Sequence, residues 1–200
     1  MLPDTETFKH ILRSSENAEA IVDKYIINGA AWLFEKRYDK KSRERFEDFR
    51  RLVANSLGLI TNECALVGSA KTGFSLHPEK DFRSFTSESD LDTIIVSKAL
   101  FDEIWDEYLE LSYRVKNSVK PLTKKDIFRQ FVSIKLKSGY QFSTPRIQDR
   151  LQAFGEIQSK VDTKFLMAYQ INFRIYRSWN AVYKYHGNNI TELRKRTATS

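Results

Sequence analysis

Two stretches decide the fold expected for this chain: LVGSAKTGFSL, residues 66–76, and SDLDTIIVS, residues 89–97. Each contains a short apolar run bounded by turn-forming residues, which is typical of a buried strand. The first run ends in Gly-Ser, and the second begins with two aspartates one residue apart. Carboxylates at the mouth of a buried strand are unfavourable unless something compensates them, usually a divalent metal. We therefore expect a binding site where the two strands end.

The paired acids and the Gly-Ser turn suit complementary tasks. Side chains alternate along a strand, so Asp90 and Asp92 point the same way, about 6.5 Å apart. Two carboxylates so placed can converge on Mg²⁺, which favours protein carboxylates together with substrate phosphates. Gly68 lets the backbone approach a phosphate closely, and the Ser69 hydroxyl can donate to a phosphate oxygen. These four residues predict a metal-assisted nucleotide site.

Further phosphate contacts are expected from the segment between the two strands. Lys71 and Thr72 follow the Gly-Ser pair in a short turn and can add donors. The pattern is not a Walker A loop, because its lysine comes before the second glycine rather than after it. The insertion HPEKDFRSFTSE, residues 77–88, can form a loop over the site. It would contribute Lys80 and Arg83 as cationic contacts.

Most of these residues also have an ordinary structural interpretation. Asp90 can be a turn residue before the strand, and Asp92 can be a salt-bridge partner at its mouth. Lys71 and Thr72 can be turn residues without a ligand. The Gly-Ser pair just upstream stays unexplained in that interpretation, which favours a binding site.

The remaining periodicity predicts an α+β domain with a small sheet and many helices. Helical spacing is expected at residues 17–39, 40–60, 97–115, 123–139, 145–161 and 179–196, the last interrupted near Gly187. Residues 165–176 alternate and are rich in aromatic side chains, which favours a later strand. We interpret residues 1–200 as a single domain. Its core is expected over about 43–111, and a helical and strand extension over 112–196.

Composition places limits on compartment and partners. The chain of 200 residues has a single cysteine, Cys64, so it forms no internal disulfide, and a reducing compartment is expected. It shows no signal pattern and no long apolar run, which predicts a cytoplasmic protein without a membrane partner. The net charge is +7, and residues 114–137 hold eight basic residues against one acid, Asp126. Such a segment attracts polyphosphates or nucleic acid, or simply solvates a surface.

The motif GSAKTGFSL … SDLDTIIVS resembles the nucleotidyltransferase superfamily of the polymerase-β type. The resemblance extends over about residues 57–111 and implies a small mixed sheet with flanking helices. It also implies transfer of an NMP group from an NTP to a hydroxyl on a protein, an RNA end or a nucleotide. By resemblance, Asp90 and Asp92 hold Mg²⁺ or Mn²⁺, and Gly68 and Ser69 hold phosphates. Members of the family are frequent in antiviral defence and toxin–antitoxin loci.

The chain departs from the family pattern in its third acid. Active members usually carry another carboxylate on a later strand, but residues 165–176 contain none. Gln170, Asn172 and Arg174 share the face where that acid is expected, and Asp162 just before the strand is the nearest candidate. The leading hypothesis is therefore an active nucleotidyltransferase with Asp162 completing the catalytic set. The alternative is a degenerate domain that binds a nucleotide, RNA or a partner protein without turnover.

Overall fold

A four-stranded mixed sheet organises the molecule and confirms the α+β class. The computed structural model describes residues 2–14, 16–116, 118–135 and 144–199. The strands are β1 (Cys64–Val67), β2 (Leu91–Val96), β3 (Phe131–Lys135) and β4 (Ile171–Tyr176). Their order is β1-β2-β4-β3, with β2 and β4 parallel and the other two pairs antiparallel. As predicted, the two motif-bearing strands, β1 and β2, are neighbours.

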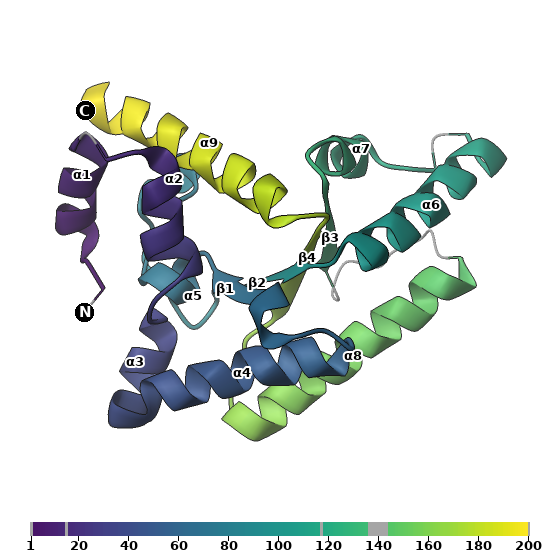
Figure 1. Ribbon diagram of the computed structural model, residues 1–200, viewed down its shortest axis with the longest axis horizontal. Helices are drawn as coiled ribbons and strands as arrows, with labels where there is room; N and C mark the ends of the chain where they lie inside the picture. The colour runs from purple at the N-terminus through teal and green to yellow at the C-terminus, as the bar shows by residue number, and fades with distance from the viewer. Residues whose placement is uncertain (1, 15, 117, 136–143, 200) are drawn as a thin grey trace.

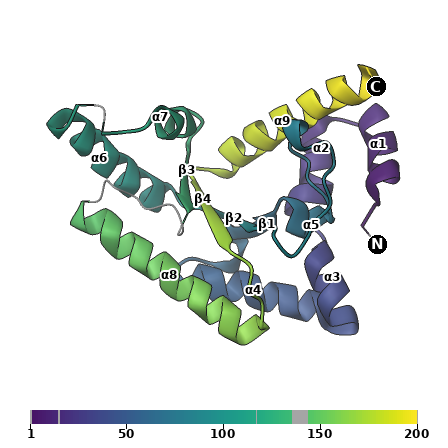
Figure 2. The same cartoon turned by 180° about the vertical axis from the view of Figure 1, so that it is seen from behind.

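Helices cover both faces of this sheet (Figure 1). They are α1 (Thr5–Arg13), α2 (Ala18–Ile21), α3 (Trp32–Tyr38), α4 (Ser42–Ser56), α5 (Ser69–Thr72), α6 (Lys98–Arg114), α7 (Pro121–Phe128), α8 (Pro145–Phe165) and α9 (Trp179–Thr199). Helices α4, α6 and α8 pack on one face, and α1, α2 and α9 pack on the other (Figure 2). In the described part of the chain, no helix combines the length and apolar character that a membrane span needs.

The alternation along β2 explains why the sheet has two buried faces. Leu91 and Ile95 belong to the core under α4, α6 and α8. Ile94 and Val96 belong to the core under α1, α2 and α9. Asp92 shares this second face but is only half-buried, because it lies at the end of the sheet. The strand therefore holds its carboxylate at the rim of an otherwise apolar layer.

The prediction of a single helix over residues 123–139 is wrong. Helix α7 ends at Phe128, and the edge strand β3 begins at Phe131. The chain reverses through Gln130, whose φ is +61°, a left-handed conformation that usually favours glycine or asparagine. Glutamine is not a turn-forming residue, so the sequence does not indicate a turn at this position. The β-branched residues of FVSIK favour a strand, but the helical spacing of the residues before them favours continuing the helix. Residues 136–139 of that stretch lie outside the described residues.

Smaller boundary differences have local backbone causes. The helix expected over 17–39 divides at Gly29, where φ is +76°, into α2 with a π-helical segment (Val22–Ile27) and then α3. The strand expected over 165–176 starts only at Ile171, since α8 continues to Phe165 and Leu166 adopts a φ of +52°. The interruption predicted near Gly187 is absent: α9 continues through this glycine, which is buried.

Candidate functional site

Two aspartates meet at the open end of β2. Asp92 is in register with Val67 of β1 on one side and with Asn172 of β4 on the other. Asp90 lies just before the strand, and its Oδ2 accepts a 2.9 Å hydrogen bond from the Asn172 side-chain amide. Both carboxylates line one cavity of about 170 Å³. The structure thus brings Asp90 and Asp92 together, as the strand alternation predicts.

The Gly-Ser turn lies directly against Asp92. Gly68 has a φ of +69°, and a Cβ atom at this position would lie 2.6 Å from Oδ2 of Asp92. Only glycine therefore allows the backbone to come this close to the carboxylate. Ser69 begins α5 and lines the same cavity as the two aspartates. A hydroxyl donor and two carboxylates consequently face one small space.

The segment between α5 and β2 supplies two cations to this cavity. Its backbone folds back on itself through hydrogen bonds from Ser75 N–H to the Arg83 carbonyl and from Phe85 N–H to the Gly73 carbonyl, both 2.8 Å. Lys80 and Arg83, both exposed, line the cavity beside the aspartates. The predicted loop over the site, with these two residues as contacts, therefore has the required placement.

A third cation, Arg174, enters the cavity from β4. Its Nη1 donates a 3.4 Å hydrogen bond to the Tyr185 hydroxyl. Burial disfavours its charge, yet Tyr176, Tyr185 and Asp92 around it leave the pKa of Arg174 raised above the ordinary value. The guanidinium is therefore permanently charged and partly balances Asp92. The sequence predicts this face for Arg174 but does not indicate that its guanidinium belongs to the site.

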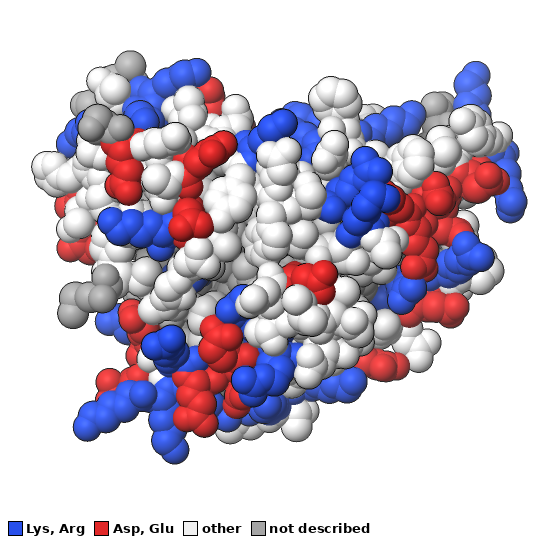
Figure 3. Space-filling model, viewed as in Figure 1, with Lys and Arg blue, Asp and Glu red and all other residues white. Residues whose placement is uncertain are grey.

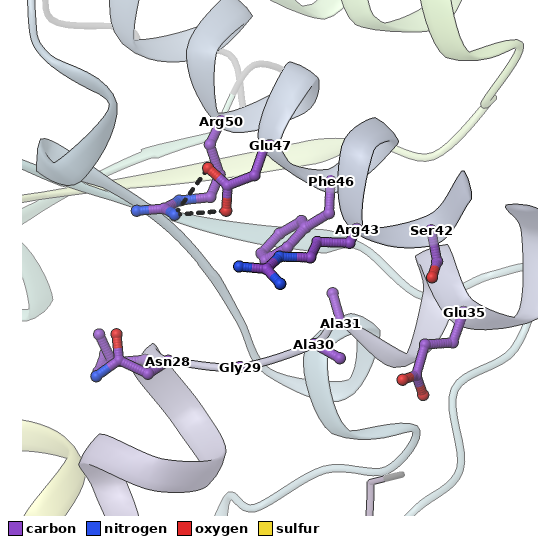
Figure 4. Close-up of a pocket in the computed structure, with 11 residues that line it drawn as sticks. Asn28, Gly29, Ala30, Ala31, Glu35, Ser42, Arg43, Phe46, Glu47 and Arg50 are labelled. Atoms are coloured by element: carbon purple, nitrogen blue, oxygen red, sulfur yellow. Dashed lines mark hydrogen bonds and ion pairs between the residues drawn. The ribbon is translucent and has the colours of Figure 1, made fainter. Parts of the chain in front are cut away.

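Lys71 lies on the other side of α5, away from the aspartates. Its ammonium is fully buried, donates a 2.9 Å hydrogen bond to the Gly29 carbonyl and lies 5.1 Å from the centre of the Phe46 ring. Burial lowers its pKa to about 8. Gly29 and Phe46 also line a separate cavity of about 390 Å³, where Arg50 pairs with Glu47 (Figure 4). The structure therefore does not support Lys71 as a phosphate contact of the aspartate cavity.

Thr72 stabilises the turn and also lines a small cavity that Asp92 lines too. Its hydroxyl lies 2.5 Å from the Phe74 carbonyl and 3.2 Å from the Gly68 carbonyl, so its proton is used within the turn. The side chain is buried. Thr72 thus holds the shape of the turn, which is the structural alternative that the sequence left open.

Asp162 is not brought to the paired aspartates. It lies on α8, which packs on the opposite face of the sheet from Asp92. Its Oδ1 accepts a 2.7 Å hydrogen bond from Gln158, whose side chain also contacts the backbone at Tyr169 and Ile171. This network fastens the start of β4 to α8. The expected role of Asp162 as the third catalytic acid finds no support in this geometry.

The position expected for a third acid is held by Asn172 and Arg174. The parallel pairing of β2 and β4 sets Asn172 opposite Asp92 and Arg174 opposite Ile94. From the other side, β3 places Ser133 opposite Arg174, and Ser133 also lines the cavity. Ser133 is not among the residues predicted for the site, because residues 131–135 (FVSIK) are expected to be helical. Side-chain alternation along a strand over these residues would identify it.

A smaller cavity of about 80 Å³ adjoins the aspartates and extends toward α9. Both cavities are lined by Ser69, Lys80, Asp92 and Arg174, and the smaller one is also lined by Tyr185 and His186. Nε2 of His186 is buried without a hydrogen-bond partner among the described residues. Burial lowers the pKa of His186 to about 3, so the imidazole is neutral. The site therefore continues from the sheet end to the surface of α9.

The carboxylates of Asp90 and Asp92 are of the chemical type that can hold a divalent ion together with phosphates. Mg²⁺ typically takes one or two protein carboxylates and completes its shell with water and phosphate oxygens. Asp90 and Asp92 supply this minimum. Within residues 2–14, 16–116, 118–135 and 144–199, no group of three His, Cys, Asp or Glu side chains converges on a metal position.

Comparison with protein-family models, curated proteins and solved structures finds no match for this chain. The four motif residues Gly68, Ser69, Asp90 and Asp92 lie where β1 ends and β2 begins, and Ser69, Asp90 and Asp92 line one cavity.

Proposed function

We propose that this protein is a metal-dependent nucleotidyltransferase that moves an NMP group from an NTP to a hydroxyl acceptor. The observation that supports the proposal is the contact between the Gly68 backbone and the Asp92 carboxylate. In this proposal the Gly-Ser turn contacts phosphates and Asp92 binds the metal, and Ser69 and Asp90 line the same cavity as Asp92. Nucleotidyl transfer depends mainly on such positioning and on fixed electrostatics.

Each residue of the site has a defined task in this proposal. Asp90 and Asp92 hold Mg²⁺ or Mn²⁺ together with the phosphates of the NTP. When bound, the ion neutralises charge on the attacking and leaving oxygens of the reaction. Ser69 donates to a phosphate oxygen, and Lys80 and Arg83 balance the charge of the triphosphate at the cavity mouth. The acceptor is a protein, an RNA end or a second nucleotide, and a defence or toxin–antitoxin setting remains a prediction.

One observation favours a second function, nucleotide binding without transfer. Asn172 stands where a third carboxylate is expected, and an amide cannot take a proton from the acceptor hydroxyl. Arg174 also presents a permanent positive charge to Asp92. This charge partly compensates the carboxylate in the absence of a metal ion. A domain of this kind would act as a sensor or binding module for a nucleotide, RNA or a partner protein.

A transfer assay distinguishes the two functions. The protein is incubated with Mg²⁺ or Mn²⁺ and each NTP labelled at the α-phosphate, with oligonucleotide, nucleotide and protein acceptors. The nucleotidyltransferase proposal predicts labelled acceptor and released pyrophosphate, both lost in Asp92→Ala. Asp162→Asn is the matched control and should retain activity, because Asp162 lies on the opposite face of the sheet.

The substitution Asn172→Asp sharpens the distinction. If the wild-type protein binds NTP without turnover and Asn172→Asp gains transfer, the protein is a degenerate binding module. Asn55→Asp on the exposed side of α4 controls for the added charge. If neither wild type nor Asn172→Asp binds or consumes NTP, both functions are excluded.

A further inference from the structure

A polar groove between α7 and α9 opens beside the candidate site. It has a volume of about 440 Å³ and is lined by Phe128, Arg129, Asn180, Lys184, Asn188 and Asn189 among others. None of the described residues that line it is acidic. Lys and Arg side chains are visible on the upper edge of the molecule between α9 and α7, whereas acids gather over α6 (Figure 3). The groove is therefore locally cationic.

An aromatic ring stands free at the edge of this groove. Phe128 is 88% exposed, which is unusual for a side chain that normally enters a core. It ends α7 immediately before Arg129, and Lys184 of α9 faces the same space. An exposed ring surrounded by cations and amide side chains is the combination with which proteins bind single-stranded nucleic acid. The ring stacks on a base, and the cations contact the backbone.

The charge around α7 extends the same surface. Lys120, Lys124 and Lys125 are exposed on or next to this helix. Asp126, the acid of the segment, is buried and accepts a hydrogen bond from the Ser133 hydroxyl, so the charged side chains exposed on α7 are lysines. Cations along a groove would track the phosphates of a strand.

Tyr185 connects the groove to the candidate site. Arg129 lies 5.9 Å from the centre of its ring and Arg174 lies 5.4 Å from it. Tyr185 and Asn189 line both the groove and the small cavity that contains Asp92. A strand lying in the groove would thus direct its end toward the aspartates.

We infer that the α7–α9 groove binds the end of a single-stranded nucleic acid and that the hydroxyl at this end is the acceptor. Phe128 stacks on a base near the end, and Arg129 and Lys184 contact phosphates. The inference rests on the proposed function for the role of acceptor. Binding of the strand itself depends only on the groove.

The test measures binding of fluorescein-labelled ten-nucleotide oligo(A) RNA and oligo(dA) DNA by anisotropy, in EDTA and without NTP. Phe128→Ala should weaken binding roughly tenfold, the usual effect of removing one stacking ring. Phe128→Tyr should restore affinity to within about twofold, because it keeps a ring. Lys184→Ala should weaken binding and reduce the salt dependence by about 0.7 in the logarithmic slope. The RNA and DNA arms show which strand is preferred.

Matched controls lie on the same helices. Leu122→Ala removes another exposed apolar side chain of α7 outside the groove, and Lys195→Ala removes an exposed lysine of α9. Both should leave affinity unchanged, and all variants should keep the thermal melting temperature of wild type. Binding of Mg²⁺–ATP should be unaffected by Phe128→Ala.

The outcomes separate this inference from the proposed function. If neither oligonucleotide binds, or if Phe128→Ala binds as tightly as wild type, the groove is not the nucleic-acid site. Label transferred only to protein would also overturn the assignment of the acceptor. If the oligonucleotide binds through Phe128 but Asp90→Asn with Asp92→Asn leaves NTP binding unchanged, the groove assignment stands and the metal–nucleotide site is wrong.

Discussion

Ser69 and Lys71 lie on opposite sides of α5 and in opposite environments, one open to solvent and the other buried. Ser69 lines the cavity that contains Asp90 and Asp92, where polar and charged side chains meet solvent. Lys71, two residues later, points to the other side and is fully buried beside Gly29. Residues two apart in a helix are rotated by about 200°, so one short turn serves two environments. The comparison shows that proximity in a motif does not place a side chain in the site.

The buried side of α5 carries a cost that the exposed side does not. An ammonium removed from water is unfavourable, and its hydrogen bond and the Phe46 ring compensate only partly. The aspartate cavity instead keeps its charges in contact with solvent and with opposite charges. We therefore expect changes at Lys71 to affect folding and changes at the cavity to affect ligand binding.

The largest expected effect is a pH-dependent stability at Lys71. The pKa of this lysine is about 8 in the folded protein, whereas an unfolded lysine titrates near about 10.4. Between these values the unfolded chain binds more protons, so the free energy of unfolding rises with pH. Relative to Lys71→Met, wild type should gain about 3 kcal/mol between pH 7.5 and pH 10.5. Urea unfolding at several pH values measures this difference.

Two comparisons make the Lys71 result specific. Lys160→Met, at an exposed position on α8, should show no such pH dependence relative to wild type. Lys71→Met should also bind Mg²⁺–ATP with wild-type affinity. Parallel stability curves for wild type and Lys71→Met would show that Lys71 is not buried in its charged form.

The second effect concerns the contact between Gly68 and Asp92. Gly68→Ala must adopt a positive φ and bring a methyl group against the carboxylate. Gly58→Ala is the matched control, since its φ is +70° but no atom lies within 4 Å of the added Cβ. Gly68→Ala should reduce the free energy of unfolding by about 2 kcal/mol, and Gly58→Ala by about 1 kcal/mol. Urea unfolding of both variants compares these costs.

Ligand binding provides a second readout for the two glycine variants. Gly68→Ala should also weaken Mg²⁺–ATP binding because Asp92 is displaced, whereas Gly58→Ala should not. Equal stability losses together with equal affinities would mean that the backbone does not approach Asp92 closely in solution.

The smallest expected effect is at the exposed cations of the cavity. Lys80→Met should weaken Mg²⁺–ATP binding roughly fivefold and leave stability unchanged, because an exposed charge is screened by solvent. The loss should shrink at high salt. Calorimetry at two salt concentrations measures it, with Lys160→Met as the control. An unchanged affinity in Lys80→Met would remove this loop from the phosphate site.

The sequence predicts the centre of the fold better than its periphery. β1, β2 and α4 follow from short apolar runs and regular helical spacing, and Asp90 and Asp92 share a face because strand side chains alternate. β3 does not follow, because the turn at Gln130 uses a residue without a turn signal. The sequence also does not predict that Ser69 and Lys71 lie in different environments on the two sides of α5. The burial of Lys71 depends on Gly29 and Phe46, which lie far away along the chain.

The prediction of a third catalytic carboxylate fails for a different reason. The absence of an acid from residues 165–176 is visible in the sequence, and Asn172 and Arg174 share the cavity face as predicted. Gln170 does not, because it precedes β4 and its side-chain amide contacts Gln158 of α8. The nearest acid along the chain, Asp162, belongs to a helix on the opposite face. Distance in sequence is therefore a poor guide once a helix and a strand pack on each other.

Calorimetry with Mg²⁺ and an ATP analogue that cannot be cleaved at the α-phosphate tests the central claim most directly. Wild type should bind the analogue in a Mg²⁺-dependent manner. Asp90→Asn with Asp92→Asn should lose at least about thirtyfold in affinity, since the ion then has no carboxylate ligand. Asp162→Asn should bind like wild type. Equal Mg²⁺-dependent affinity in wild type and in the double variant would show that these aspartates do not form the nucleotide site.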